Sequence, residues 1–299
     1  MKIAVTGAFS YSGKYITKRL LDRGEEVITL TNHPNRPDPF NGKVKAYPLD
    51  FDEASLTRSL QGVEVLVNTY WVRFDKGKNT QPRAVENTRK LVNAAKAARV
   101  RRIVHISIAN PSADSHLLYY WGKAANEKVI MESGLSYAIL RPTVLIGKED
   151  ILINNIAYLL RRLPFFFIPG DGSYGIQPVY IEDLADLAVE GVYSKENYVI
   201  DAVGPDTYTF KDLVKLIGKK VGAERPLISV PPRLALLAAQ FLSLFVRDVV
   251  LTPEEVEGLM ANLLISREPA RGKTAFKDWL AANKDTVGMK YASELQRHY

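Results

Sequence analysis

The sequence predicts an α/β fold, in which a doubly wound parallel sheet is followed by a smaller, mainly helical region. Two observations predict this fold class. Short runs rich in Val and Ile alternate with helical patterns through the first two thirds of the chain, and this alternation is typical of parallel strands joined by crossover helices. After about residue 203 the pattern becomes mainly helical.

The expected elements follow one another in a regular order. The strands are expected at 2–6, 26–31, 44–47, 63–68, 102–108, 136–140 and 198–202. The helices between them are expected at 12–24, 53–61, 80–99, 121–133 and 181–192. Later helices begin after the capping residues Thr209 and Thr252, and two more short ones are expected within 278–299.

This order predicts two regions. A Rossmann-like domain is expected over 1–150, and 178–202 returns to it. A smaller substrate or cap region is expected from 151–177 and 203–299.

Composition restricts the class of protein. The 299 residues include 46% hydrophobic ones, enough for a large core. The absence of cysteine excludes disulfides and thiolate chemistry, and the four histidines show no metal-ligand spacing, so no metal site is expected. The formal charge of +7 is spread along the chain and predicts no nucleic-acid interface. The chain starts directly in a strand without a signal-peptide pattern, so a cytoplasmic location is expected.

The first strand leads into a helix through a glycine-bounded turn. The apolar run from Ile3 breaks at Gly7, and the helical pattern resumes after Gly13. Unpaired N–H groups and the positive end of the helix dipole suit a pyrophosphate at such a turn. Ser10 replaces the central glycine, and its hydroxyl could itself bond a phosphate oxygen. The predicted cofactor-binding residues in this turn are Gly7, Phe9, Ser10, Tyr11, Ser12 and Gly13.

The end of the second strand predicts the type of dinucleotide. A cofactor with a free 2′-hydroxyl usually meets a carboxylate there, but no carboxylate occurs between Val27 and Pro37. Asn32, His33 and Arg36 could instead receive a 2′-phosphate. The sequence therefore predicts NADP(H) in preference to NAD, with a solvated loop arginine as the alternative interpretation of Arg36.

Two further loops at the carboxyl ends of strands are candidates for cofactor contacts. Asp50 could accept a hydrogen bond from the adenine amino group and Phe51 could flank the ring, although Asp50 could equally cap the helix that begins near residue 53. Thr69 and Tyr70 follow the fourth strand in an aromatic loop, and we expect them to contact the cofactor as well.

A tyrosine and a lysine four residues apart carry the predicted chemistry. Tyr119 and Lys123 would lie on one face of a helix. A phenol is a poor base at neutral pH, but a nearby ammonium favours its ionised form. Tyr119 could then exchange a proton with an alcohol or carbonyl, while Lys123 could also bond the ribose hydroxyls. Ser107, at the end of the fifth strand, could polarise the substrate oxygen.

These residues resemble the short-chain dehydrogenase/reductase superfamily. The matching stretches, in chain order, are Thr6-Gly7 to Gly13, Leu49-Asp50, Ser107, Tyr119 with Lys123, Leu140-Arg141-Pro142-Thr143 to Gly147, and Gln177-Pro178-Val179-Tyr180-Ile181-Glu182-Asp183. They cover about residues 1–220 and look most like the epimerase/dehydratase-like and atypical branches, which include the nicotinamide-binding accessory subunit of respiratory complex I. The resemblance implies that residues 142–146, among them Pro142 and Val144, line the nicotinamide.

The predicted function is an oxidoreductase that moves hydride between NADP(H) and a carbonyl or alcohol. Two departures from the family pattern keep alternatives open: Ile108 stands where many relatives have a second Ser or Thr, and Tyr119 follows Ser107 by only twelve residues. The alternatives are a non-catalytic NAD(P)-binding sensor or assembly subunit, and a nucleotide-sugar epimerase or dehydratase.

Two apolar segments bear on the substrate and on membranes. Residues 234–246 are apolar except for Gln240 and Ser243, and residues 161–167 combine two arginines with three phenylalanines. The first segment is too short to span a bilayer, and it is either a buried or lid helix or one that lies in a membrane interface. A small, hydrophobic substrate and peripheral membrane contact are both compatible with these segments, and the oligomeric state is open.

Overall fold

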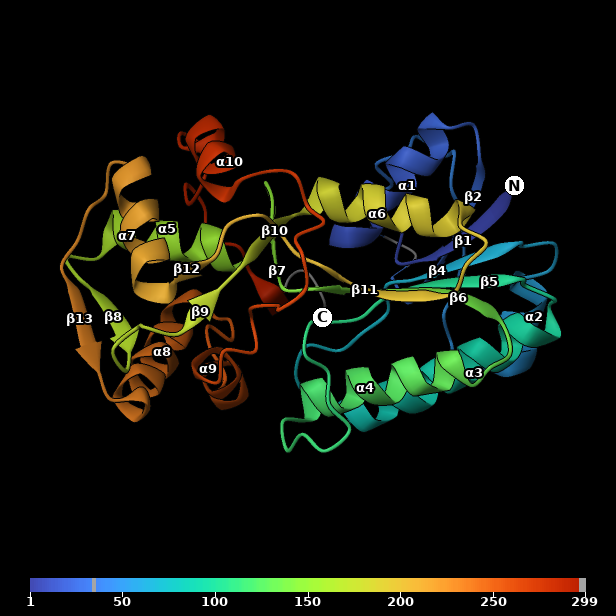
Figure 1. Ribbon diagram of the computed structural model, residues 1–299, viewed down its shortest axis with the longest axis horizontal. Helices are drawn as coiled ribbons and strands as arrows, with labels where there is room; N and C mark the ends of the chain where they lie inside the picture. Colours follow the sequence, from blue (N-terminus) through green and yellow to red (C-terminus); the bar gives the residue numbers. More distant parts are fainter. Residues whose placement is uncertain (34–35, 296–299) are drawn as a thin grey trace. The chain divides into compact units, whose positions relative to one another are not determined.

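The computed structural model describes residues 1–33 and 36–295 (Figure 1). The chain divides into two compact units. One comprises Met1–Pro142 and Ile181–Ala202, and the other comprises Thr143–Tyr180 and the chain from Val203 onward.

The first unit is built on a seven-stranded parallel sheet in the order β11-β6-β5-β4-β1-β2-β3. The strands are β1 (Lys2–Thr6), β2 (Glu26–Thr31), β3 (Lys45–Pro48), β4 (Val65–Asn68), β5 (Arg102–Ile106), β6 (Ser136–Pro142) and β11 (Tyr198–Ala202). The order reverses between β1 and β4, and in open α/β sheets ligands bind outside the carboxyl ends of the strands at such a point.

Helices cover both faces of this sheet, so the predicted doubly wound fold is confirmed (Figure 1). Helices α1 and α6 lie on one face, and α2, α3 and α4 lie on the other. Their bounds are α1 (Tyr11–Asp22), α2 (Glu53–Ser59), α3 (Gln81–Ala97), α4 (Leu118–Met131) and α6 (Ile181–Tyr193). A sheet covered on both faces explains why strands such as β4, with four buried residues in succession, read as continuous apolar runs.

The second unit is mainly helical, as predicted, and also contains three small two-stranded sheets that the sequence did not predict. Its helices are α5 (Leu152–Arg162), α7 (Phe210–Lys220), α8 (Pro232–Val246), α9 (Pro253–Met260) and α10 (Phe276–Asn283). The strand pairs are β7 (Val144–Ile146) with β10 (Pro178–Tyr180), β9 (Gly175–Ile176) with β12 (Tyr208–Thr209), and β8 (Phe166–Pro169) with β13 (Leu227–Val230).

Two helix starts in this unit follow the predicted capping residues. The Thr209 side chain accepts from the Asp212 N–H at the start of α7, and Thr252 forms a capping box with Glu255 at the start of α9. Of the two short helices predicted within 278–299, one corresponds to α10, and residues 296–299 lie outside the described residues.

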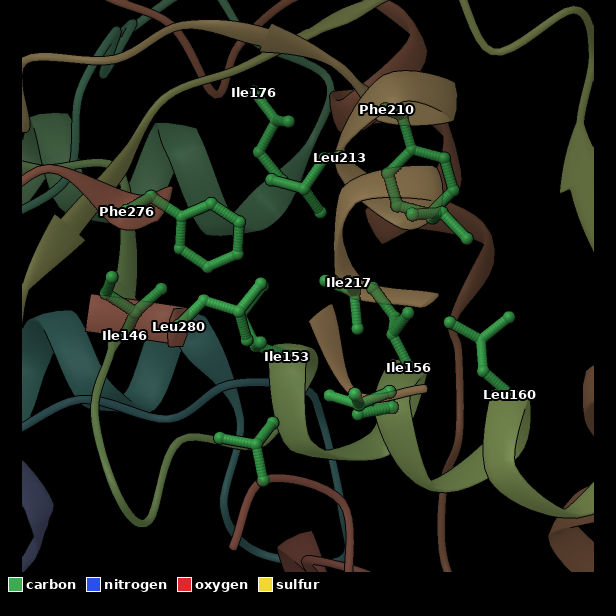
Figure 2. Close-up of a cluster of buried hydrophobic side chains, with 14 of the residues drawn as sticks. Ile146, Ile153, Ile156, Leu160, Ile176, Phe210, Leu213, Ile217, Phe276 and Leu280 are labelled. Atoms are coloured by element: carbon green, nitrogen blue, oxygen red, sulfur yellow. The ribbon is translucent and has the colours of Figure 1, made fainter. Parts of the chain in front are cut away.

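The second unit has its own hydrophobic core (Figure 2). Figure 2 shows apolar side chains of α5, α7 and α10 converging on it, among them Ile153, Ile156, Leu160, Leu213, Ile217, Phe276 and Leu280. The stacked rings of Tyr174 and Phe210, 5.6 Å apart, belong to this core.

Candidate functional site

The turn between β1 and α1 has the tight geometry that its two glycines predict. Gly7 has a φ of +67°, a left-handed conformation that side chains disfavour. A Cβ on Gly13 would lie 2.1 Å from the Gly7 carbonyl oxygen. The Ser10 N–H and hydroxyl both donate to that same oxygen, at 2.8 and 2.5 Å. Ser10 therefore closes the turn, in addition to replacing the central glycine.

The amino terminus of α1 suits a phosphate group. Ser10 is the N-cap residue but makes no side-chain capping bond, and the first turn of α1 contains no acidic residue. The first-turn N–H groups and the positive end of the helix dipole thus meet no competing carboxylate in that turn. The other predicted turn residues, Phe9, Tyr11 and Ser12, are half-buried beside it.

The loop after β4 is tied directly to this turn. The Thr69 N–H donates to the Thr6 hydroxyl at 2.7 Å, and the Thr69 hydroxyl donates to the Thr6 carbonyl at 2.6 Å. The Tyr70 N–H also donates to the Thr6 hydroxyl, at 3.1 Å. Because Thr6 precedes Gly7, the structure brings the predicted Thr69 and Tyr70 beside the glycine turn.

The three residues predicted to bind a 2′-phosphate, Asn32, His33 and Arg36, follow β2. Asn32 and His33 are exposed, and the Arg36 N–H donates to the His33 carbonyl at 3.2 Å. Burial, and to a smaller extent the charge of Arg36, lowers the pKa of His33. The structure thus keeps His33 and Arg36 in one short segment after β2.

The loop after β3 corrects one interpretation of Asp50. The N-cap of α2 is Asp52, whose carboxylate accepts from the Ser55 N–H at 2.8 Å. Asp50 is exposed and instead accepts from the Asp52 N–H at 3.1 Å, so it does not cap the helix. Phe51 has a φ of +56°, and its ring centroid lies 4.7 Å from that of Tyr70. This contact joins the loops after β3 and β4.

Helix α4 begins at Leu118, earlier than expected, and so includes Tyr119 in its first turn. Tyr119 is half-buried, and Lys123, one turn later, is 3% exposed. Trp71 contacts both side chains: its ring lies 5.8 Å from the Tyr119 ring, and the Lys123 Nζ lies 4.9 Å from its centroid. The structure thus brings Tyr119 and Lys123 together around an indole.

Lys123 is held by its own chain. Its ammonium donates to the Ile106 carbonyl oxygen at 2.9 Å. Burial lowers the pKa of Lys123 to about 7, although the nearby charge of Glu127 acts in the opposite direction. Burial and then the charge of Lys123 lower the pKa of His105 to about 3, so His105 is neutral at physiological pH. Lys123 is therefore a group whose charge changes near neutrality.

Ser107 is paired with Glu127, a residue that sequence reasoning missed. The Ser107 hydroxyl donates to the Glu127 carboxylate at 2.5 Å, and Arg141 donates to both oxygens of that carboxylate, at 2.9 and 2.5 Å. The hydrogen bond with Glu127 raises the pKa of Arg141. One signal could have revealed Glu127: it follows Lys123 by four residues, which places Tyr119, Lys123 and Glu127 along one face of α4.

The two residues expected at the nicotinamide belong to different units. Pro142 ends β6 in the first unit, and its carbonyl accepts from the Ala109 N–H at 2.8 Å. Val144 lies in β7 of the second unit and pairs with Pro178.

The lowered pKa of Lys123 predicts a pH-dependent stability. Between pH 7 and the ordinary lysine pKa of 10.5, the unfolded chain binds a proton at this position and the folded chain does not. Relative to a Lys123→Met variant, the native protein should therefore gain stability as pH rises through this window, by up to about 1.4 kcal/mol per pH unit. Urea unfolding of both proteins from pH 7 to 10 measures the difference, and a difference that does not change with pH would contradict the prediction.

Comparison with known proteins agrees with this geometry. Residues 7–156 match the family described as NAD(P)H-binding. The chain is 24% identical over 225 residues to the mitochondrial NADH dehydrogenase [ubiquinone] 1 alpha subcomplex subunit 9 of Arabidopsis thaliana, covering 71% of this chain and 56% of that protein. It is 25% identical over 301 residues to the mitochondrial NADH-ubiquinone oxidoreductase 40 kDa subunit of Neurospora crassa, covering 96% and 77% of the two chains.

Solved structures share the fold. The NADPH-dependent quinone oxidoreductase QOR2 of Escherichia coli, solved with NADPH, superposes with a TM-score of 0.72 at 23% identity, covering 88% of this chain and 91% of that one. The match over half of the sequence shows the family: this chain belongs to the NAD(P)H-binding proteins with a fold of the short-chain dehydrogenase/reductase type.

Proposed function

We propose that the protein is an NADP(H)-dependent oxidoreductase that interconverts a carbonyl and an alcohol. The observation that carries this proposal is the buried Lys123 one turn from Tyr119, with Trp71 in contact with both. In this proposal Tyr119 is the proton donor, and Lys123 is the titratable cation beside it.

The residues around the glycine turn fit a dinucleotide. The start of α1 would hold the pyrophosphate, because no side chain caps its N–H groups. Gly13 permits the tight turn before it, since a Cβ there would clash with the Gly7 carbonyl oxygen. The side chains of His33 and Arg36 would bind a 2′-phosphate, and Phe51 and Tyr70 offer ring faces for the adenine.

The chain's own residues would handle the proton. The bound nicotinamide supplies or accepts the hydride at the substrate carbon. In the direction of reduction, the Tyr119 phenol donates its proton to the carbonyl oxygen, and the charged form of Lys123 stabilises the phenolate that remains. The Ser107 hydroxyl donates to the Glu127 carboxylate. Ser107 would therefore help to orient helix α4 and would not act on the substrate oxygen by itself. The indole of Trp71 beside Tyr119 favours an apolar substrate.

A second function, NAD(P)H binding without catalysis, is favoured by one specific observation. The Ser107 hydroxyl and the Lys123 ammonium both donate to groups of the chain itself, at 2.5 and 2.9 Å. Two relatives are named as subunits of NADH dehydrogenase complexes, and an assembly or sensor role is consistent with those names.

Titration calorimetry of the cofactor-free protein with NADPH and with NADH tests the cofactor proposal. We expect NADPH to bind at least tenfold more tightly, because the 2′-phosphate gains a charged partner in Arg36. The Arg36→Glu variant should lose this preference. Arg58→Glu, an exposed arginine in the last turn of α2, is the matched control and should keep it. Equal affinities, or a preference that survives in Arg36→Glu, would contradict NADP(H) specificity, and no binding of either nucleotide would overturn the proposed function.

Turnover of NADPH with a panel of aldehydes, ketones and quinones separates the two functions. Tyr119→Phe should keep NADPH binding and lose about 10²- to 10⁴-fold in kcat, the usual contribution of a general acid. Unchanged turnover in Tyr119→Phe would remove Tyr119 from the mechanism. NADPH binding without turnover on any substrate would support the non-catalytic function.

A further inference from the structure

Helix α8 of the second unit has an unusual distribution of side chains. Its 13 residues between Arg233 and Arg247 include no charged side chain. The two buried residues are alanines, Ala235 and Ala239, one turn apart. The most deeply buried side chains of this helix are therefore among its smallest.

Most of the large apolar side chains of α8 face solvent, while Leu236, Leu242 and Val246 are half-buried. Five of them are between 53% and 75% exposed, and they are Leu234, Leu237, Phe241, Leu244 and Phe245. Their spacing of three or four residues places them along one stripe. The rings of Phe241 and Phe245 contact each other at 4.9 Å. A stripe of this size is far from the isolated exposed residues that are normal on a soluble surface.

A second apolar face lies on the neighbouring ribbon of β8 and β13. Helix α8 follows β13 directly and packs on β8 (Figure 1). Phe167 and Ile228 are register partners in this ribbon, and both are exposed. The exposed Phe165 ring lies 5.1 Å from the Phe167 ring. We call the exposed residues of α8 and of this ribbon together the apolar surface.

Positive charges outnumber negative ones around the apolar surface, although the exposed Asp171 and Glu224 adjoin its segments. Residues 161–170 and 225–251, which carry all of these side chains, contain five arginines and one carboxylate. The arginines are Arg161, Arg162, Arg225, Arg233 and Arg247. The carboxylate, Asp248, is buried and accepts from the N–H groups of Glu294 and Leu295 at 2.7 and 3.0 Å, so it is not itself presented on the surface.

We propose that the second unit docks through the apolar surface on an anionic membrane. The apolar side chains would enter the boundary between headgroups and acyl chains, and the arginines that bracket α8 would bind lipid phosphates. A second copy of the chain fits less well, because a two-fold interface would bring together two surfaces that each carry an excess of arginine.

The dimensions of α8 agree with a helix that lies in the plane of the interface. Its 15 residues give a length of about 22 Å. Among residues 1–33 and 36–295, no helix has the length and apolar composition required to cross a bilayer. Helix α8 would therefore lie in one leaflet, with its apolar stripe facing the acyl chains.

Cosedimentation of the full chain with vesicles tests the proposal. We expect binding to phosphatidylcholine vesicles containing phosphatidylglycerol, and at least tenfold weaker binding to pure phosphatidylcholine. The double variant Phe241→Glu with Phe245→Glu should bind the anionic vesicles at least tenfold more weakly, and Arg233→Gln with Arg247→Gln should lose most of the preference for anionic lipid. Met131→Glu, an exposed apolar position on α4, is the matched control for an added charge and should bind as the native chain does.

Three results would overturn the proposal. These are no binding to anionic vesicles, equal binding by the Phe241→Glu, Phe245→Glu double variant, and a dimer in analytical ultracentrifugation that this double variant converts to a monomer. The last would assign the surface to a second copy. NADPH affinity measured on the same variants should be unchanged, so failure here is distinguishable from failure of the proposed oxidoreductase.

Discussion

Replacing Glu127 with alanine should lower the free energy of unfolding by about 3 kcal/mol, near the lower end of the range for breaking a buried ion pair. The Glu127 side chain is 3% exposed, and it accepts from the Ser107 hydroxyl and from the Nε and Nη2 groups of Arg141. Its removal leaves the Arg141 charge without its carboxylate and the Ser107 hydroxyl without its acceptor. The Arg141 side chain is 30% exposed, so water would offset part of the loss.

Urea unfolding at pH 7, followed by circular dichroism, measures this change. Glu132→Ala on α4 is the matched control, because its pair with Lys128, at 3.9 Å, is exposed and should contribute less than about 1 kcal/mol. Glu127→Gln keeps an acceptor for Ser107 without the charge, and it should fall between Glu127→Ala and the native protein. A loss below about 1 kcal/mol in Glu127→Ala would show that the pair does not hold this region together.

Replacing Gly13 with alanine should abolish dinucleotide binding and destabilise the first unit. The new Cβ would lie 2.1 Å from the Gly7 carbonyl oxygen and 2.7 Å from the Gly7 carbonyl carbon, both backbone atoms. Only a displacement of α1 or of the turn relieves such a contact, at a cost of about 1–3 kcal/mol. Because the displaced turn no longer presents its N–H groups correctly, we expect NADPH affinity to fall at least a hundredfold, or about 2.7 kcal/mol.

Gly24→Ala provides the control for this prediction. Gly24, unlike Gly13, has a positive φ, +78°, and a Cβ there meets no atom within 4 Å. Its replacement should cost stability through backbone strain and leave NADPH affinity unchanged. Calorimetry with NADPH and urea unfolding of both variants distinguish the two effects. An NADPH affinity in Gly13→Ala close to that of the native protein would show that the turn does not hold the cofactor.

The fold class could be predicted because its signals are local. Strand and helix periods, the glycine turn, and the capping threonines at 209 and 252 each depend on a few neighbouring residues, and the structure confirms them. The three two-stranded sheets of the second unit were missed, because strands of two to four residues are too short to show a period. The N-cap of α2 is Asp52 and not Asp50. Sequence patterns do not locate a helix start to within two residues, so they could not choose between these two aspartates.

The sequence by itself determined which residues could carry chemistry and in what order they occur. Only the tertiary structure decided their partners, because Ser107 and Arg141 reach Glu127 from positions 20 and 14 residues away along the chain. The sequence also did not determine which side chains of α8 face the core and which face solvent. An apolar helix can face a core or solvent with the same composition, and here Ala235 and Ala239 are the buried residues while five large side chains are exposed.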